Sequence, residues 1–246
     1  MKKFIHAVSL LLAAVMLTVS LASCDWGVHP VPEDGKVPTE SFTPHQFGVE
    51  DATVKGVRIG MTQEQVKKIL GEPDEVEDGT GDGFIYGTCI DYLYGELSLS
   101  FYDVNEGDDL TLGTIFTASP EIKFVGGLHV GCTKDEVLKV FPHDENPEPL
   151  YFEGTEESCG DYIYGHTNGS LFIEEKPTDE IYCAYFNRYG QDEDNTYMME
   201  YYYYPPLNWN ADKSDYIGEY YSMIFYMDGE TDTVTDIRIE FGLEMH

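Results

Sequence analysis

The clearest pattern of apolar and polar positions is a motif that occurs twice, 71 residues apart. The first copy, from residue 56, reads GVRIGMTQEQVKKIL, and the second, from residue 127, reads GLHVGCTKDEVLKVF. In both copies a short apolar stretch reaches a glycine, a threonine follows, and apolar residues then recur at helical spacing. Each copy therefore predicts a short helix that begins after its threonine.

Capping boxes mark where both predicted helices begin. Thr62 with Gln65, and Thr133 with Glu136, form the S/T-x-x-E/Q pair in which each partner satisfies a backbone N–H of the first turn. Helical spacing predicts the buried faces, which consist of Val66, Ile69 and Leu70 in the first copy and Val137, Val140 and Phe141 in the second.

Strand-like alternation follows both helices. Apolar and polar residues alternate over 96–102, which predicts a strand with one buried face, and 110–117 is expected to return beside it. In the second copy, Asp228 and Gly229 form a dipeptide favoured in tight hairpins. The segment 235–241 then alternates again, which predicts a hairpin near the end of the chain.

The motif and the residues after it resemble a known family. The residues that carry the likeness are Gly60-Met61-Thr62, Val66, Leu70-Gly71-Glu72-Pro73 and Ile85-Tyr86-Gly87. They are similar to the BamE (SmpA/OmlA) family, and the tandem arrangement is similar to the β-lactamase-inhibitory-protein fold. The second copy departs from the pattern, because Phe141-Pro142 stands where the first has its Leu-Gly-x-Pro stop.

This resemblance implies an α+β fold. We expect two tandem repeats, over 53–126 and 127–246, each a short capped helix packed on antiparallel strands, together forming a two-layer helix-on-sheet domain. The second repeat carries an insertion near 174–215. The resemblance also implies a non-catalytic role in protein binding or envelope assembly, with an enzyme inhibitor of the β-lactamase-inhibitory-protein type as the alternative.

The N-terminus predicts a lipoprotein signal peptide over residues 1–23. Lys2 and Lys3 precede an apolar run that ends at Leu21-Ala22-Ser23-Cys24. This ending resembles the lipobox of bacterial lipoproteins, which implies diacylglycerol on the Cys24 thiol and cleavage after Ser23. We therefore expect an extracytoplasmic protein anchored by lipid to the cell membrane. An ordinary cleaved signal peptide with a chance cysteine is the alternative.

A tether is predicted between the anchor and the repeats. Residues 24–52 contain prolines and scattered acids without an apolar period, which is typical of an extended spacer. A loop packed on the domain is the alternative for 42–49. Anchoring at the cell surface and on the periplasmic side both fit, because the sequence does not distinguish a one-membrane from a two-membrane cell.

The chain is strongly acidic. Its 46 Asp and Glu residues against 14 Lys and Arg give a formal charge of −32. Removal of residues 1–23, which hold two lysines and no acids, changes this to −34. Such a charge repels nucleic acid and favours a basic protein partner.

Catalytic chemistry is not indicated by any motif. The sequence lacks H-E-x-x-H, G-x-S-x-G, a P-loop and a dinucleotide fingerprint, so we expect no enzyme, no cofactor and no metal. Two acidic runs, 103–108 and 228–232, resemble parts of calcium loops, but turn chemistry explains both, and calcium is the weaker hypothesis. Four cysteines remain after Cys24, and both disulfides and buried thiols are open for Cys89, Cys132, Cys159 and Cys183.

An aromatic segment is the best binding candidate. As a strand it alternates sides, so that one pair of tyrosines packs in the core and the other lies on an open face. Aromatic residues also suit strands for structural reasons alone, which is the alternative. A solute- or glycan-binding lipoprotein would use the same segment. The candidate partner-binding residues are Tyr201, Tyr202, Tyr203, Tyr204 and Trp209.

Overall fold

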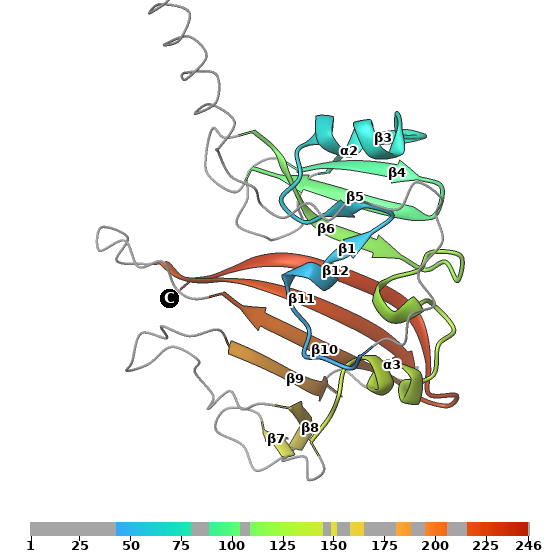
Figure 1. Cartoon of the computed structure of the whole chain (residues 1–246), viewed down its shortest axis with the longest axis vertical. Coiled ribbons are helices and arrows are strands. Elements are labelled where there is room, and N and C mark those ends of the chain that lie inside the picture. The colour runs from blue at the N-terminus through green and yellow to red at the C-terminus, as the bar shows by residue number, and fades with distance from the viewer. Residues whose placement is uncertain are drawn as a thin grey trace, which may run out of the picture. The chain divides into compact units, whose positions relative to one another are not determined.

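A ten-stranded antiparallel sheet dominates the computed structural model, beside a small two-stranded sheet, β1-β2 (Figure 1). The structure describes residues 43–79, 89–103, 109–144, 149–151, 158–164, 181–187, 195–205 and 216–245, which belong to one unit, Thr39–His246. The strand order in the large sheet is β3-β4-β5-β6-β12-β11-β10-β9-β8-β7. The elements are β1 (Thr53–Val54), β2 (Val57–Arg58), α2 (Gln63–Leu70), β3 (Glu75–Gly79), β4 (Cys89–Tyr94), β5 (Leu97–Tyr102), β6 (Thr111–Thr117), α3 (Lys134–Val140), β7 (Pro149–Tyr151), β8 (Ser158–Tyr164), β9 (Ile181–Asn187), β10 (Thr196–Tyr204), β11 (Tyr216–Asp228) and β12 (Thr233–Met245).

The predicted α+β fold of two helix-on-sheet repeats is wrong. The described chain is mostly β-structure, with α2 and α3 as its two short α-helices. Its strands do not form separate layers for each repeat, because β6 pairs directly with β12, with Ile115 opposite Ile239. Two unpaired strand edges would expose rows of backbone N–H and C=O groups, and joining them satisfies both. Two helices of seven and eight residues are also too short to cover ten strands.

The two copies of the motif nevertheless share their local structure. Both capping boxes are confirmed, since Thr62 and Thr133 accept hydrogen bonds from the N–H groups of Gln65 and Glu136. Each motif also contacts a later strand in the same way. Gly60 N donates to Leu112 O at 2.7 Å, and Gly131 N donates to Val234 O at 2.8 Å.

The predicted buried helix faces are confirmed except at one position. Val66, Val137, Val140 and Phe141 are buried and Leu70 is half-buried. Ile69 is instead 45% exposed. A helix of two turns has room for one buried row on the sheet, and Ile69 lies at its margin.

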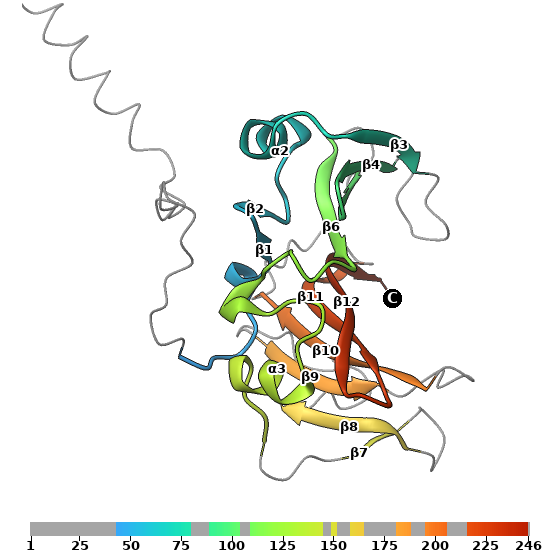
Figure 2. The ribbon, with the colours of Figure 1, turned by 90° about the vertical axis from the view of Figure 1, so that its right-hand side faces the viewer.

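The predicted strands are confirmed. In β5, Leu97, Leu99 and Phe101 are fully buried while the residues between them are half-buried. In β12, Ile237 and Ile239 are fully buried. The helices and β1-β2 lie on the side of the sheet that these residues face (Figure 2).

Residues 43–52, here called the strap, precede the first motif but pack against the second. Phe47 is fully buried, and its ring centroid lies 5.9 Å from that of Phe141, directly after α3. Phe47 N donates to the Tyr164 hydroxyl at 3.2 Å, and His45 N donates to Val140 O at 3.3 Å. Residues 43–52, which include the last residues of the predicted tether, therefore pack on the folded domain.

We predict that the substitution Phe47→Ala destabilises the whole domain. Removing a fully buried aromatic ring costs about 3–5 kcal/mol, because the cavity cannot close completely. Chemical denaturation of the purified chain measures this loss. Val49→Ala is the matched control in the same strap, since Val49 is 43% exposed, and its effect should stay within about 0.5 kcal/mol. Equal effects of the two substitutions would show that the strap is not part of the core.

Candidate functional site

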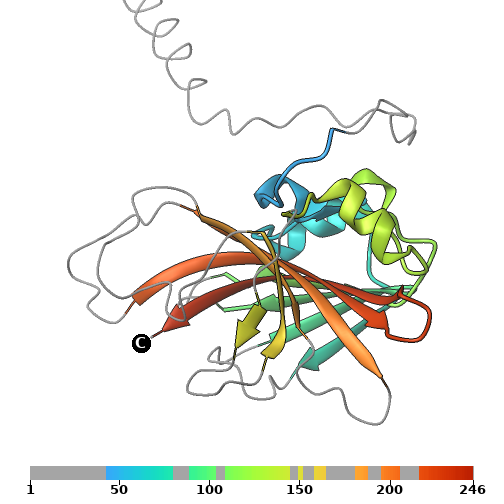
Figure 3. The ribbon, with the colours of Figure 1, turned by 90° about the horizontal axis from the view of Figure 1, so that it is seen from below.

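The helices lie on one face of the sheet (Figure 3). The opposite face, here called the open face, carries a cluster of tyrosine rings. Tyr185 stacks on Tyr202, with centroids 5.5 Å apart and ring planes inclined by 16°, and Tyr202 stacks on Tyr204 at 6.2 Å and 17°. Tyr220 lies 5.6 Å from Tyr202 and 5.8 Å from Tyr204, and Tyr162 lies 6.4 Å from Tyr185. These five residues, the tyrosine patch, cross four adjacent strands, β8 to β11.

The predicted binding residues divide between the two faces of β10. Tyr201 is fully buried and Tyr203 is 8% exposed, and the Tyr201 ring lies 4.8 Å from that of Phe141. Their burial leaves these two residues no surface for a partner. Tyr202 and Tyr204 lie on the open face. Trp209 and the lipidation candidate Cys24 lie outside the described residues.

A buried carboxylate lies beside the tyrosine patch. Glu200 is only 5% exposed although it lies on the open face. Its two carboxylate oxygens accept hydrogen bonds from Asn187 Nδ2 at 2.7 Å and from the Tyr202 hydroxyl at 2.6 Å. Burial, with the nearby Tyr185 and Glu200, raises the pKa of Tyr202 well above its usual value. Tyr202 therefore stays a neutral donor to Glu200 at any physiological pH.

An ion pair on β12 continues the open face. Arg238 Nε lies 2.8 Å from Glu240 Oε2. Burial raises the pKa of the Glu240 carboxyl, as does the charge of Glu200, and the charge of Arg238 opposes both. The alternation over 235–241 is consistent with Arg238 and Glu240 sharing one side of a strand, but nothing in the sequence selects them as site residues. Only the strand register shows that they share a face with Glu200.

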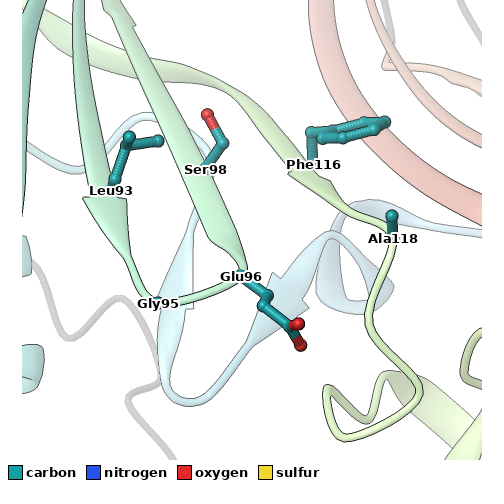
Figure 4. Close-up of a pocket in the computed structure, with 6 residues that line it drawn as sticks. All are labelled: Leu93, Gly95, Glu96, Ser98, Phe116 and Ala118. Carbon is teal, nitrogen blue, oxygen red and sulfur yellow. The ribbon is translucent and has the colours of Figure 1, made fainter.

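A hollow of about 240 Å³ extends this face toward the first half of the chain (Figure 4). Leu93, Ser98 and Phe116 line it, together with Gly95, Glu96 and Ala118. Phe116 is opposite Ser98 on one side and Arg238 on the other, so the hollow adjoins the ion pair. Phe116 is 37% exposed, so its ring offers apolar surface at the edge of the hollow.

The strap holds a second cluster of titratable groups. Ligand atoms of His45, Glu50 and Asp51 lie within 4.8 Å of one another, the one such group of three metal-ligating side chains among the described residues. His45 Nε2 lies 2.9 and 3.0 Å from the two oxygens of Asp51, and Nδ1 lies 3.2 Å from Thr43 O. With an acceptor at each ring nitrogen, this geometry suits a protonated imidazolium that pairs with Asp51.

Of the two acidic runs, 103–108 and 228–232, the structure describes the second in full. The Asp228 carboxylate accepts hydrogen bonds from the N–H groups of Glu230 and Thr231, which lower its pKa. This is the predicted turn chemistry. In the other run, residues 104–108 lie outside the described residues.

Three of the cysteines, Cys89, Cys132 and Cys183, are buried. Burial, helped by the adjacent Asp91, raises the pKa of Cys89 to about 11, so this thiol is a poor nucleophile. The side chain of Cys159 lies outside the described part of the chain.

Comparison with known proteins identifies one segment. Residues 48–87 match the family described as the outer membrane protein assembly factor BamE domain. No curated protein and no solved structure matches the chain. Residues 48–87 are therefore a BamE-like region, and its described part runs from the strap through α2 to β3. Among the described helices, neither is long and apolar enough to cross a membrane.

We predict opposite effects from removing the hydroxyl groups of two neighbouring tyrosines. Tyr201 Oη is buried and has no hydrogen-bond partner among the described residues, so Tyr201→Phe should leave stability unchanged or raise it by up to about 1 kcal/mol. Tyr202→Phe removes a hydrogen bond to a buried carboxylate and should cost about 1.5–3 kcal/mol. Urea denaturation of both variants compares them directly. A loss of stability in Tyr201→Phe similar to that in Tyr202→Phe would contradict the assignment of the two faces.

We also predict that the strap weakens as the pH rises above 6.5. Partial burial lowers the pKa of His45, but the hydrogen bond and charge of Asp51, with Thr43 O and Glu50, outweigh it and raise the pKa. The ion pair therefore contributes fully below pH 6.5, the value for unfolded His, and is lost as the pH rises through the raised folded value. Solvent screening of the half-exposed ring limits the effect to roughly 0.2–1 kcal/mol.

Thermal melts between pH 6 and pH 8.5 measure this dependence. The difference in stability between the parent chain and His45→Gln should shrink as the pH rises. His143, exposed and outside the strap, supplies the control His143→Gln. A constant difference for His45→Gln across the range would contradict the pairing with Asp51.

Proposed function

We propose that this protein is a membrane-anchored, extracytoplasmic lipoprotein that binds another protein of the cell envelope through its open face. Its role is non-catalytic and belongs to envelope assembly. The observation that carries the proposal is the tyrosine patch, five tyrosine rings in mutual contact on the sheet face that neither helix covers. Tyrosine is enriched at protein interfaces because its ring buries apolar area while its hydroxyl keeps a polar partner.

The BamE-like region supports the assembly role, since the matched family is described as an outer membrane protein assembly factor. The second motif, from Gly127, repeats the capping box of the first and its contact with a late strand. We infer that it is a second BamE-like motif, which the family comparison does not cover.

The anchor fits the same function. In the proposal, residues 1–23 are removed and Cys24 carries lipid. The 19 residues from Cys24 to Phe42 then span at most about 65 Å when extended. The strap at the end of this tether lies on the helix side of the sheet (Figure 2), so the tether would join the domain on the side away from the open face.

A basic protein is the partner that suits this face best. Glu200 and Glu240 lie on it against Arg238, and the whole chain carries a formal charge of −32. The hollow beside Phe116 adds an apolar contact of about the size of one large side chain. An enzyme inhibitor would use the same open sheet, and the identity of the partner, a hydrolase or an assembly component, distinguishes these two functions.

Site-specific photo-crosslinking in the native membrane tests the proposal. A photo-reactive amino acid at Phe116, on the open face, should give a discrete protein adduct. The same probe at Ile69, on the helix side, is the matched control because its exposure, 45% against 37%, is similar. Adducts of equal yield from both positions, or from neither, would refute docking on the open face.

Two further variants connect the adduct to the patch and to the anchor. Tyr204→Ala should reduce the yield at Phe116 about ten-fold, which corresponds to the loss of one aromatic interface residue. Cys24→Ala should release the protein from the membrane fraction. A Tyr204→Ala chain that melts normally and still crosslinks fully would remove the patch from the interface.

A further inference from the structure

We propose that the strap binds a zinc ion through His45, Glu50 and Asp51. One ligand atom from each of these three side chains lies within 4.8 Å of the other two. A ring nitrogen with carboxylate oxygens is a donor set that zinc takes, whereas calcium and magnesium take oxygen ligands. The strap lies on the helix side of the sheet (Figure 2), so the site is separate from the open face and independent of the docking function.

The orientation of the His45 ring is the first support. Nδ1 lies 3.2 Å from Thr43 O, so a neutral ring donates its N–H there and keeps its lone pair at Nε2. A backbone acceptor in this place is the usual outer-shell partner of a metal-ligating histidine. Nε2 lies 2.9 and 3.0 Å from the two Asp51 oxygens, and lone pairs that face each other so closely need a proton or a metal ion between them. Ligands of a tetrahedral zinc ion with bonds of about 2.0 Å are about 3.3 Å apart, so a small shift admits the ion.

The space that Gly48 leaves for Glu50 is the second support. A Cβ at position 48 would lie 2.7 Å from Oε2 of Glu50 and 3.0 Å from its Cδ and Oε1. The Glu50 carboxylate therefore occupies the place of a side chain at position 48. The backbone of Gly48 is extended, with φ at −136°, so it is this space and not the conformation that favours glycine. Gly48 N also donates to Asp51 Oδ2 at 2.9 Å, which orients the second carboxylate.

The surroundings of the cluster are the third support. Asp51 is 3% exposed, and the His45 ring lies edge-on to Phe141 with its centroid 6.1 Å away. Burial raises the pKa of the Asp51 carboxyl although it accepts hydrogen bonds from Gly48 N and His45. A divalent ion would compensate this buried charge. His45 is 35% exposed and Glu50 is exposed, so an ion can enter from the solvent.

Zinc would fix the strap in its folded form. Its ligands enclose Phe47, the fully buried residue that packs on Phe141, and three protein ligands leave the fourth tetrahedral position to water. The three residues read H-x4-E-D in the sequence, which is no familiar metal motif, so only the folded strap brings them together. A proton and a zinc ion would compete for His45 Nε2, so the thermal melts of the His45–Asp51 pair require a chelator.

Titration of the purified chain with zinc chloride, in reducing buffer at about pH 7.5, tests the site. Calorimetry measures affinity and stoichiometry, and nuclear magnetic resonance of the chain with ¹⁵N-labelled histidine follows the ring nitrogens. The variant His45→Gln assigns the His45 signals. We expect one zinc ion to bind at the site and to shift the signal of His45 Nε2, and calcium chloride to leave this signal in place.

Two variants that leave the fold intact locate the ion. Glu50→Gln weakens one ligand and Gly48→Ala displaces it, so each should reduce the zinc affinity at least about ten-fold. Glu50 is exposed, and the Cβ added at position 48 meets only the end of its flexible side chain, so both variants should melt like the parent chain. Val49→Ala, in the same strap, is the matched control and should bind zinc unchanged, since Val49 offers no ligand.

Three outcomes would overturn the zinc site. Zinc that binds His45→Gln as tightly as the parent chain is an adventitious ion only, held by other side chains of this acidic protein. A His45 Nε2 signal that does not respond to zinc excludes the ring as a ligand. Full affinity in both Glu50→Gln and Gly48→Ala would leave fewer ligands than the site needs. The crosslink from Phe116 tests docking on the open face separately.

Discussion

The pairing of β6 with β12 is the interaction on which the rest of the structure depends. It joins the strands that follow the first motif to those that follow the second, through four residue pairs that include Ile115 with Ile239. Without this pairing, each half would expose an unpaired strand edge. Each short helix would also pack on only a few strands. With it, the isoleucines on one face complete a shared core. The residues on the other face, Phe116 and Arg238, become neighbours on a surface that neither half has alone.

The open face acquires its chemistry from that continuity. Alternation along each strand sends tyrosine, glutamate and arginine to one side, and antiparallel pairing then aligns them across strands. Glu200 is buried on this side because large aromatic neighbours surround it, not because it faces the core. Polar groups buried among apolar rings stabilise the fold only while their hydrogen-bond partners are present. In the same way Ser222 lies directly between Tyr202 and Glu240 in one row across three strands.

Local features of the fold could be predicted from the sequence, whereas the long-range ones could not. The capping boxes at Thr62 and Thr133 predicted where the helices begin, because a capping box is a contact between residues only three positions apart. Alternation in the segment 96–102 gave its strand and its buried face. No local sequence pattern identified β12 as the strand that pairs with β6, because many alternating strands could pair with the same sheet edge. The same holds for Phe47, whose burial depends on Phe141 and Tyr164, more than 90 residues away.

The candidate site shows the same division. Alternation along one strand is enough to send Tyr202 and Tyr204 to the face opposite Tyr201. The membership of Tyr185 and Tyr220 in the patch depends on the register of other strands, which a single sequence does not encode locally. The sequence did not identify Glu200 as a site residue, because it is one of 46 acidic residues and stands in no distinctive motif.

The strap also affects the order in which the chain can fold. Phe47 lies 117 residues before Tyr164, the group that its backbone contacts. During synthesis of the chain, residues 43–52 have no core to join until α3 and β8 have followed. Such non-local contacts form slowly, because a long loop must close before they stabilise anything. We therefore expect the packing of the strap on Phe141 to be a late step of folding.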